Sequence, residues 1–130
     1  MKTDNINTMN LNPGDHVAVR RGGGLFGIVK YVHHGIYIGD GRIVEFNRKG
    51  IEVVSKNVFF KGAKEKYIIK YNNPYPADIV VRTAKSFIGA KGYNLGLRNC
   101  EHFATFCKTG SWDSYQVSTL SPGEIQREAI

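Results

Sequence analysis

The sequence predicts one domain in which β-strands come first and helices follow and pack on the sheet. Three observations support this prediction. The first half of the chain carries β-branched and aromatic segments separated by turn residues. The second half carries two segments with apolar residues at helical spacing. The chain has 130 residues, 42% of them hydrophobic, which is the size and composition of a single globular domain with its own core.

The two ends of the chain differ in composition from the middle. Residues 1–12 are polar and lack the apolar block of a secretory signal, so we expect a flexible N-terminal arm. Residues 13–110 carry the predicted strands and helices. Residues 111–130 are a mostly polar C-terminal tail, with at best a short helix at Pro122–Ala129. No apolar run approaches the roughly 18 residues that cross a membrane, so we expect a soluble, cytoplasmic protein.

The predicted strands follow one another in the first half of the chain. They are His16–Arg20, Ile28–Ile38, Arg42–Phe46, Ile51–Val54 and Lys66–Tyr71, with a short helical or irregular piece around Val58–Phe60. Gly22–Gly24 are interpreted as a flexible loop, and Gly39–Gly41 as the tight turn of a hairpin. Pro74 and Pro76 end the predicted sheet.

Two helices are predicted after these prolines. The first runs from Ala77 to Ile88, because apolar residues recur along one face and Gly89 marks its end. We expect this face to pack on the sheet. The second helix runs from Cys100 to about Thr109, with Asn99 as a favourable N-cap and Gly110 just past its end.

Cys100 lies in the first turn of the second predicted helix. Backbone N–H groups are unpaired there and favour the thiolate, which is the reactive form of cysteine. The position is typical of a nucleophile, although most free cysteines are buried and act as small hydrophobic residues. Cys107 lies on the same side of the helix and is interpreted as a core residue. The two cysteines are about 10.5 Å apart along the helix, beyond disulfide reach, so both are expected to be free thiols.

Two histidines, His33 and His34, are neighbours in the predicted strand Ile28–Ile38. Alternation places His33 and Tyr37 on one face and His34 and Ile36 on the other, so only one histidine can face a given site. A cysteine nucleophile needs a base nearby and a polar group that orients the base. One of these histidines and Cys100 would supply the first two groups of such a set.

The residues around these positions resemble two motifs of one enzyme family. The segments His33–Gly41 (HHGIYIGDG) and Asn99–Ala104 (NCEHFA) are similar to the H-box and NC-box of the lecithin:retinol acyltransferase (LRAT) family. The likeness runs from about Pro13 to Gly110. It implies an α+β fold, with an antiparallel sheet packed against helices, in a circularly permuted member of the papain-like NlpC-type superfamily. It also implies thiol chemistry on acyl groups, with a glycerophospholipid as the usual acyl donor.

Matched residue by residue, the resemblance implies that Cys100 is the nucleophile and His33 the general base. The position twelve residues after the base is usually a third histidine, and in this sequence it is Glu45. A glutamate accepts a hydrogen bond from an imidazole N–H, as the acid of a Ser-His-Glu set does. A three-residue hairpin loop would place Glu45 opposite Gly35 and on the His33 face, whereas a two-residue loop would place it on the other face. Asn47 is the alternative orienting residue.

The chain is basic, with a formal net charge of +7, and lysines crowd the segment from Lys56 to Lys70. Such a charge favours anionic surfaces, so peripheral contact with an anionic membrane is an expected partnership, without a transmembrane anchor. No aromatic-stacking or DNA-reading module accompanies the lysines, so specific nucleic-acid binding is not expected. No Cys-x-x-Cys or His-x-x-x-His pair is present, and neither a metal nor another cofactor is expected.

The leading hypothesis is a thiol-dependent acyltransferase or acyl hydrolase of the phospholipase A type, in which Cys100 forms an acyl thioester. The oxyanion would be stabilised by backbone N–H groups at the start of the Cys100 helix, with His16 or Tyr31 as a further donor. Two alternatives stay open. One is a non-catalytic LRAT-like protein-interaction module, which the replacement of the third histidine favours, and the other is a cysteine amidase or peptidase.

Overall fold

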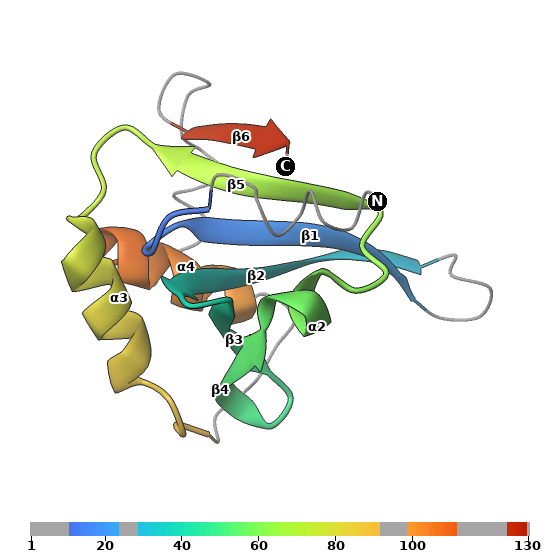
Figure 1. The fold of residues 1–130 in the computed structure, drawn as a ribbon, viewed down its shortest axis with the longest axis horizontal. Coiled ribbons are helices and arrows are strands. Elements are labelled where there is room, and N and C mark those ends of the chain that lie inside the picture. Colours follow the sequence, from blue (N-terminus) through green and yellow to red (C-terminus); the bar gives the residue numbers. More distant parts are fainter. Residues whose placement is uncertain (1–10, 24–28, 92–98, 112–124, 130) are drawn as a thin grey trace.

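A computed structural model describes residues 11–23, 29–91, 99–111 and 125–129. At its centre is a six-stranded sheet with the strand order β4-β3-β2-β1-β5-β6, in which every neighbouring pair is antiparallel (Figure 1). The strands are β1 (His16–Gly23), β2 (Val29–Gly39), β3 (Arg42–Asn47), β4 (Gly50–Ser55), β5 (Glu65–Tyr71) and β6 (Ile125–Ala129). The helices are α2 (Lys56–Phe60), α3 (Ala77–Ser86) and α4 (Asn99–Thr109). The predicted fold class, an antiparallel sheet packed against helices, is confirmed.

Two segments differ from the sequence-based expectation. Gly22 and Gly23 extend β1 instead of belonging to a loop, because they pair with Lys30 and Val29 across the β1–β2 ladder. Residues Ile125–Ala129 form β6 on the edge of β5, where the sequence predicted at best a short helix. The backbone partners that hold both segments extended lie elsewhere in the chain. Residues 1–10 of the predicted arm, and residues 112–124 and 130 of the predicted tail, lie outside the described residues.

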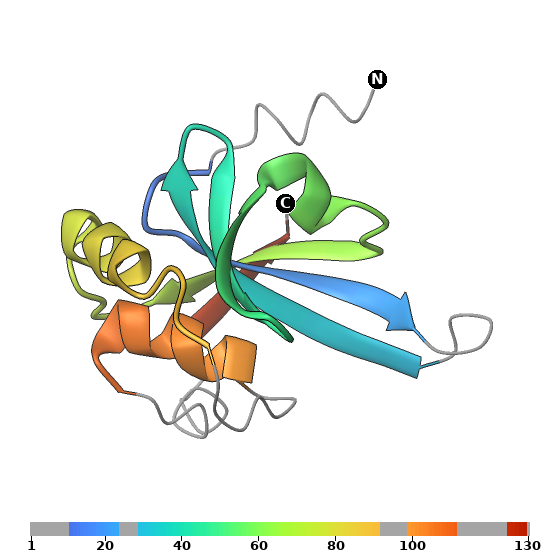
Figure 2. The same ribbon diagram turned by 90° about the horizontal axis from the view of Figure 1, so that it is seen from below.

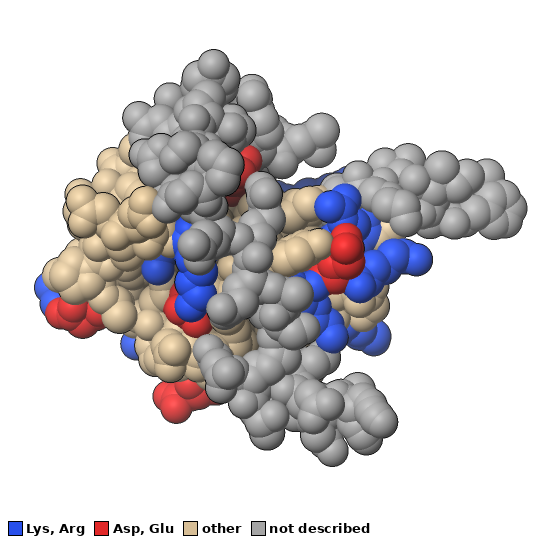
Figure 3. Space-filling model, turned by 90° about the horizontal axis from the view of Figure 1, so that it is seen from above, with Lys and Arg blue, Asp and Glu red and all other residues tan. Residues whose placement is uncertain are grey.

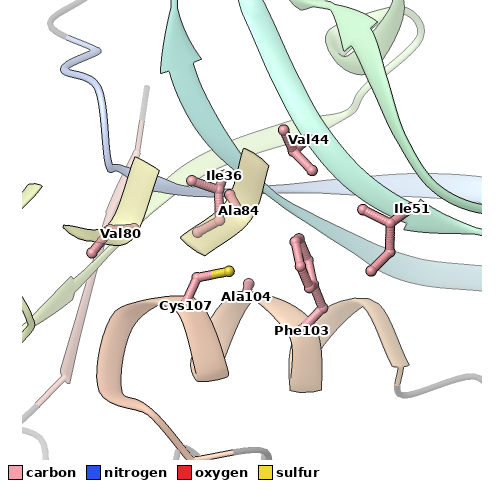
Figure 4. Close-up of a cluster of buried hydrophobic side chains, with 8 residues drawn as sticks. All are labelled: Ile36, Val44, Ile51, Val80, Ala84, Phe103, Ala104 and Cys107. Carbon is pink, nitrogen blue, oxygen red and sulfur yellow. The ribbon is translucent and has the colours of Figure 1, made fainter. Parts of the chain in front are cut away.

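One face of the sheet packs against α3 and α4, as Figure 2 shows. In the core between them, side chains from β2, β3 and β4 meet side chains from the two helices (Figure 4). The buried cluster consists of Ile36, Val44, Ile51, Val80, Ala84, Phe103, Ala104 and Cys107. Phe103 also contacts Phe46 and Phe87 edge to face. Cys107 is fully buried, so its predicted place in the core is confirmed.

The opposite face of the sheet is covered by the short helix α2. Ser55 caps this helix by accepting a hydrogen bond from the N–H of Val58. The core on this side consists of Val17, Val19, Tyr37, Ile43, Phe59 and Phe60. Strand β2 therefore contributes to both cores, with alternate side chains pointing to opposite faces as strand geometry requires. This alternation also separates the two histidines of β2.

Candidate active site

The β2–β3 hairpin determines which residues lie beside His33. Gly35 pairs with Glu45, and the register shifts by a bulge next to the turn. The turn residues Gly39, Asp40 and Gly41 all have positive φ, at 95°, 53° and 71°. The pairing of Gly39 with Arg42 leaves Asp40 and Gly41 as a two-residue turn, and the bulge produces the register that was expected of a three-residue loop. Glu45 therefore lies on the same face of the sheet as His33.

His33 and Glu45 are directly hydrogen-bonded. Nε2 of His33 lies 2.8 Å from Oε1 of Glu45, and the two side chains are only 16% and 12% exposed. An ionised carboxylate only accepts hydrogen bonds, so Nε2 carries the proton of this bond. The structure therefore brings together two of the residues that the resemblance assigns to the site.

Asn47, the rival for orienting His33, contacts Glu45 instead. Its Nδ2 donates to Oε2 of Glu45 over 2.8 Å. Its Oδ1 accepts a hydrogen bond from the backbone N–H of Lys49, also over 2.8 Å. The two candidates thus act in series, because Glu45 holds the imidazole and Asn47 holds Glu45.

Cys100 is the second residue of α4 and is half-buried. Its Sγ lies 4.0 Å from the carbonyl oxygen of Val32, the residue before His33. Among the described pairs, β3 pairs with β2 only as far as Gly35, whereas β1 continues along β2 to Val29. The start of α4 therefore reaches β2 beyond the last β2–β3 pair, and the thiol lies beside His33.

The protonation of His33 reflects both neighbours. Burial alone would lower its pKa, but hydrogen bonds to Cys100 and Glu45, together with the charges of these two groups, raise the pKa of His33 to about 9. Burial alone would raise the pKa of Glu45. Hydrogen bonds from His33 and Asn47, together with the charges of His33 and Arg21, outweigh this effect, so the pKa of Glu45 lies below its ordinary value. At neutral pH the site therefore contains an imidazolium between the carboxylate of Glu45 and the sulfur of Cys100.

Two further residues of the site were not identified from the sequence. The ring of Phe59 on α2 packs against His33, with 5.3 Å between ring centroids. Arg21 lies over the same Phe59 ring at 6.0 Å and donates to the carbonyl oxygen of Phe59. Strand alternation would have placed Arg21 on the His33 face, since Arg21 follows Val19, the partner of His33, by two residues. The contact with Phe59 has no comparable signal in the sequence.

Gly35 fits between these groups because it has no side chain. A Cβ atom at this position would lie 2.6 Å from Cγ2 of Ile43 and 3.1 Å from Cε1 of Phe59. Any side chain at position 35 would therefore displace Ile43 and Phe59, and Phe59 is the residue that packs against His33. The glycine of the H-box-like segment is required by this close approach and not by an unusual backbone angle.

His16 and His34 contact each other on the opposite face of the sheet, which is the face that packs against α4. His16 is fully buried, with Nδ1 2.8 Å from the hydroxyl of Tyr71 and Nε2 2.8 Å from Nδ1 of His34. Both ring nitrogens of His16 are thus engaged away from Cys100, so the expectation that His16 could be an oxyanion donor is wrong. The side chain of Tyr31, the other suggested donor, is not among those that the structure describes.

The described part of the chain contains neither a metal-binding cluster nor a membrane-spanning helix. No group of three or more His, Cys, Asp and Glu side chains in this part of the chain is arranged to hold a metal ion. No helix in it is long and apolar enough to cross a membrane. Both cysteines are free thiols, as predicted.

Comparisons with known proteins agree with the motifs. The family model described as lecithin retinol acyltransferase matches residues 9–73 and 52–113. Protein LEAD-SENSITIVE 1 of Arabidopsis thaliana is 41% identical over 51 residues, a match that covers 39% of this chain but only 18% of that protein. Human phospholipase A and acyltransferase 4 is 28% identical, with 81% of this chain and 74% of the relative covered. Human phospholipase A and acyltransferase 1 is 29% identical, with 91% of this chain and 80% of the relative covered. Because the family model matches most of its length, the chain belongs to the lecithin retinol acyltransferase family.

Proposed function

We propose that the protein is a thiol-dependent acyltransferase or acyl hydrolase of the phospholipase A type that acts through an acyl thioester on Cys100. The observation that carries the proposal is the connected set of Cys100, His33 and Glu45, with Asn47 behind Glu45. Membership of the family supports acyl chemistry. The names of the two human relatives support a phospholipid-type acyl donor.

In the first half of the proposed reaction, the Cys100 thiolate attacks the carbonyl carbon of an ester. Glu45 occupies Nε2 of His33, which leaves Nδ1 as the nitrogen that exchanges a proton with the site. A carbon–sulfur bond forms, and the oxyanion of the tetrahedral intermediate is stabilised by backbone N–H groups at the start of α4. The carbon–oxygen bond of the ester then breaks, and the leaving alkoxide takes the proton from Nδ1 of His33.

In the second half, an acceptor attacks the thioester. Now neutral, His33 takes a proton from the acceptor through Nδ1 as the acceptor bonds to the acyl carbon. The carbon–sulfur bond breaks, and Cys100 leaves as a thiolate beside the restored imidazolium. Water as the acceptor gives hydrolysis, and an amine or alcohol gives acyl transfer.

Glu45 takes over the task of the usual third histidine in this scheme. Its carboxylate fixes the ring of His33 and stabilises the imidazolium form, as the acid of a Ser-His-Glu set does. A charged acceptor makes a stronger hydrogen bond to the imidazole than a neutral one does. The replacement is therefore compatible with catalysis.

An exposed apolar residue beside the thiol supports a fatty acyl donor. Val32, whose carbonyl oxygen lies next to Sγ of Cys100, is 37% exposed. An exposed valine at this place offers an apolar contact to an acyl chain that enters the site. We therefore propose a glycerophospholipid as the donor class.

The thioester is the species to measure. After incubation with a diacyl glycerophospholipid, intact-protein mass spectrometry should show one added acyl chain, which peptide mapping locates on Cys100 and neutral hydroxylamine removes. Cys100→Ala and His33→Gln should not form this adduct, whereas the matched variant Cys107→Ala should. An ether-linked phospholipid, which has no acyl ester, is the substrate control.

Two outcomes would contradict the proposal. A folded wild-type chain that never acquires an acyl group from ester donors would favour the non-catalytic interaction module. Turnover of amide donors with no reaction of esters would favour the amidase or peptidase.

A further inference from the structure

Helix α2 connects the proposed site to the surface. Its inward residue Phe59 is fully buried and packs on His33 at 5.3 Å between ring centroids. Its neighbour Val58 points outward and is 56% exposed, more than any other large hydrophobic residue reported for the described part of the chain. A partner bound to the outer side of α2 would therefore be separated from His33 of the proposed site only by this helix.

Basic residues lie near the exposed valine, on and beside α2. We define the basic patch as Arg21, Lys61, Lys64 and Lys66. Lys61 follows α2 directly and its N–H donates to the carbonyl oxygen of Val58. Lys66 pairs with Val19 and therefore lies on the same face of the sheet as Arg21. Figure 3 shows Lys and Arg side chains gathered around an acidic residue towards the end of the sheet where β1 ends and β5 begins.

The patch is strongly positive overall. Glu65 forms an ion pair with its cross-strand partner Arg20, and alternation directs both side chains to the other face of the sheet. Lys61 and Lys64 are exposed, and Arg21 lies partly exposed between β1 and α2. An apolar side chain among cations is the composition of surfaces that bind the interface of an anionic membrane.

We propose that the basic patch and Val58 form a docking surface for an anionic lipid membrane. The role of this surface rests on the proposed function, because docking would present membrane phospholipid to Cys100. Charge complementarity favours this partner, and Val58 would enter the boundary between headgroups and acyl chains. A nucleic acid fits less well, because the aromatic residues of α2, Phe59 and Phe60, are buried and offer no face for base stacking.

Vesicle co-sedimentation tests the proposal. The wild-type chain should bind vesicles of phosphatidylcholine and phosphatidylserine, with binding that weakens as salt is added. Each basic residue near an anionic surface contributes about fivefold to binding, so Lys61→Gln with Lys64→Gln should weaken it roughly 25-fold. Lys85→Gln with Lys91→Gln is the matched control, because it removes the same charge from exposed positions outside the patch. This control should change binding by less than about threefold.

A second variant tests the apolar part, and a third separates docking from chemistry. Val58→Ser should weaken vesicle binding several-fold at unchanged net charge, with circular dichroism and thermal unfolding as checks on folding. Cys100→Ala should bind vesicles as the wild type does. Docking without acyl-thioester formation would therefore count against the proposed function alone.

Three outcomes would overturn the docking proposal. The first is equal binding to vesicles of phosphatidylcholine alone, and the second is equal weakening by the patch and control variants. The third is tighter binding to duplex RNA or DNA than to anionic vesicles at the same salt, which would assign the patch to nucleic acid.

Discussion

Asn47 and His33 occupy different oxygens of the same carboxylate. Nδ2 of Asn47 lies 2.8 Å from Oε2 of Glu45, and Nε2 of His33 lies 2.8 Å from Oε1. The amide therefore fixes the carboxylate without competing for the oxygen that contacts the imidazole. Substitutions of Glu45 and of Asn47 should therefore differ in their effects on Cys100 reactivity and on catalysis.

Replacement of Glu45 should change the pH dependence of Cys100. In Glu45→Gln an acceptor remains but the charge is lost, so the pKa of His33 should fall from about 9. The imidazolium then supports the thiolate less, and alkylation of Cys100 at pH 7 should slow by about tenfold. Glu45→His should retain most of the reactivity. The measurement is the pH profile of iodoacetamide labelling, and identical profiles for the three proteins would show that Glu45 is not coupled to the thiol.

Replacement of Asn47 should act through Glu45. Asn47→Ala removes the donor to Oε2, so we expect kcat to fall by roughly threefold to tenfold while KM changes little. Asn47→Asp places a second carboxylate against Glu45 and should raise the pKa of Glu45 by charge repulsion, with a larger loss of activity below neutral pH. Steady-state kinetics across pH would separate the two variants. Equal losses at every pH would indicate a purely structural role.

Gly35→Ala should destabilise the protein and disturb the site. The added Cβ would meet Cγ2 of Ile43 at 2.6 Å and Cε1 of Phe59 at 3.1 Å. Overpacking of this kind costs roughly 1–3 kcal/mol of unfolding free energy, which urea denaturation measures. Gly62→Ala is a useful comparison, because a Cβ there meets nothing within 4 Å although φ is +69°. Only Gly35→Ala should also slow Cys100 labelling, since only it displaces Phe59.

The two thiols should differ in reactivity and in their effect on stability. Burial raises the pKa of Cys107 to about 12, so a thiol reagent at pH 8 should modify only Cys100 in the native state and both cysteines in urea. Cys107→Ala should lower the unfolding free energy by about 1 kcal/mol because it leaves a small cavity in the core. Cys100→Ala should change the unfolding free energy by less than this, since the side chain is half-buried. Native labelling of two thiols per chain would contradict the assignment.

Stability should depend on the charge of His33. Its pKa rises from 6.5 to about 9 on folding, so its contribution is complete below about pH 6.5 and is lost as the pH rises through 9. The lowered pKa of Glu45 acts at the other end, where stability is lost as the pH falls through the acidic range. Unfolding free energy measured between pH 6 and 10 should fall by roughly 1–3 kcal/mol more in the wild type than in His33→Gln. A parallel decline in both proteins would mean that other groups titrate.

Local periodicity accounts for the parts of the site that the sequence predicted. Strand alternation separated His33 from His34, and the expected register placed Glu45 opposite Gly35, although a bulge beside a two-residue turn produces this register instead of a three-residue loop. Helical spacing identified Cys107 as a core residue. In each case the deciding residues are close in the chain, so sequence spacing largely determines their spatial relation.

The features that were missed depend on contacts between distant segments. His16 and Tyr71 are 55 positions apart yet share a hydrogen bond, and β6 becomes a strand through its pairing with β5. The packing of Phe59 on His33 likewise joins α2 to β2. The hydrogen bond from Asn47 to Glu45 depends on side-chain rotamers, which the strand register does not determine.

The partly buried row of hydrogen bonds through Tyr71, His16 and His34 has a direction. A neutral imidazole has one N–H and one bare nitrogen, so if Nδ1 of His16 accepts from the Tyr71 hydroxyl, Nε2 must donate to Nδ1 of His34. In the other arrangement His34 donates to His16, and His16 donates to the tyrosine oxygen. The tautomers of the two histidines are therefore linked, and the protons of these three side chains, contributed by β5, β1 and β2, can reverse only as a set.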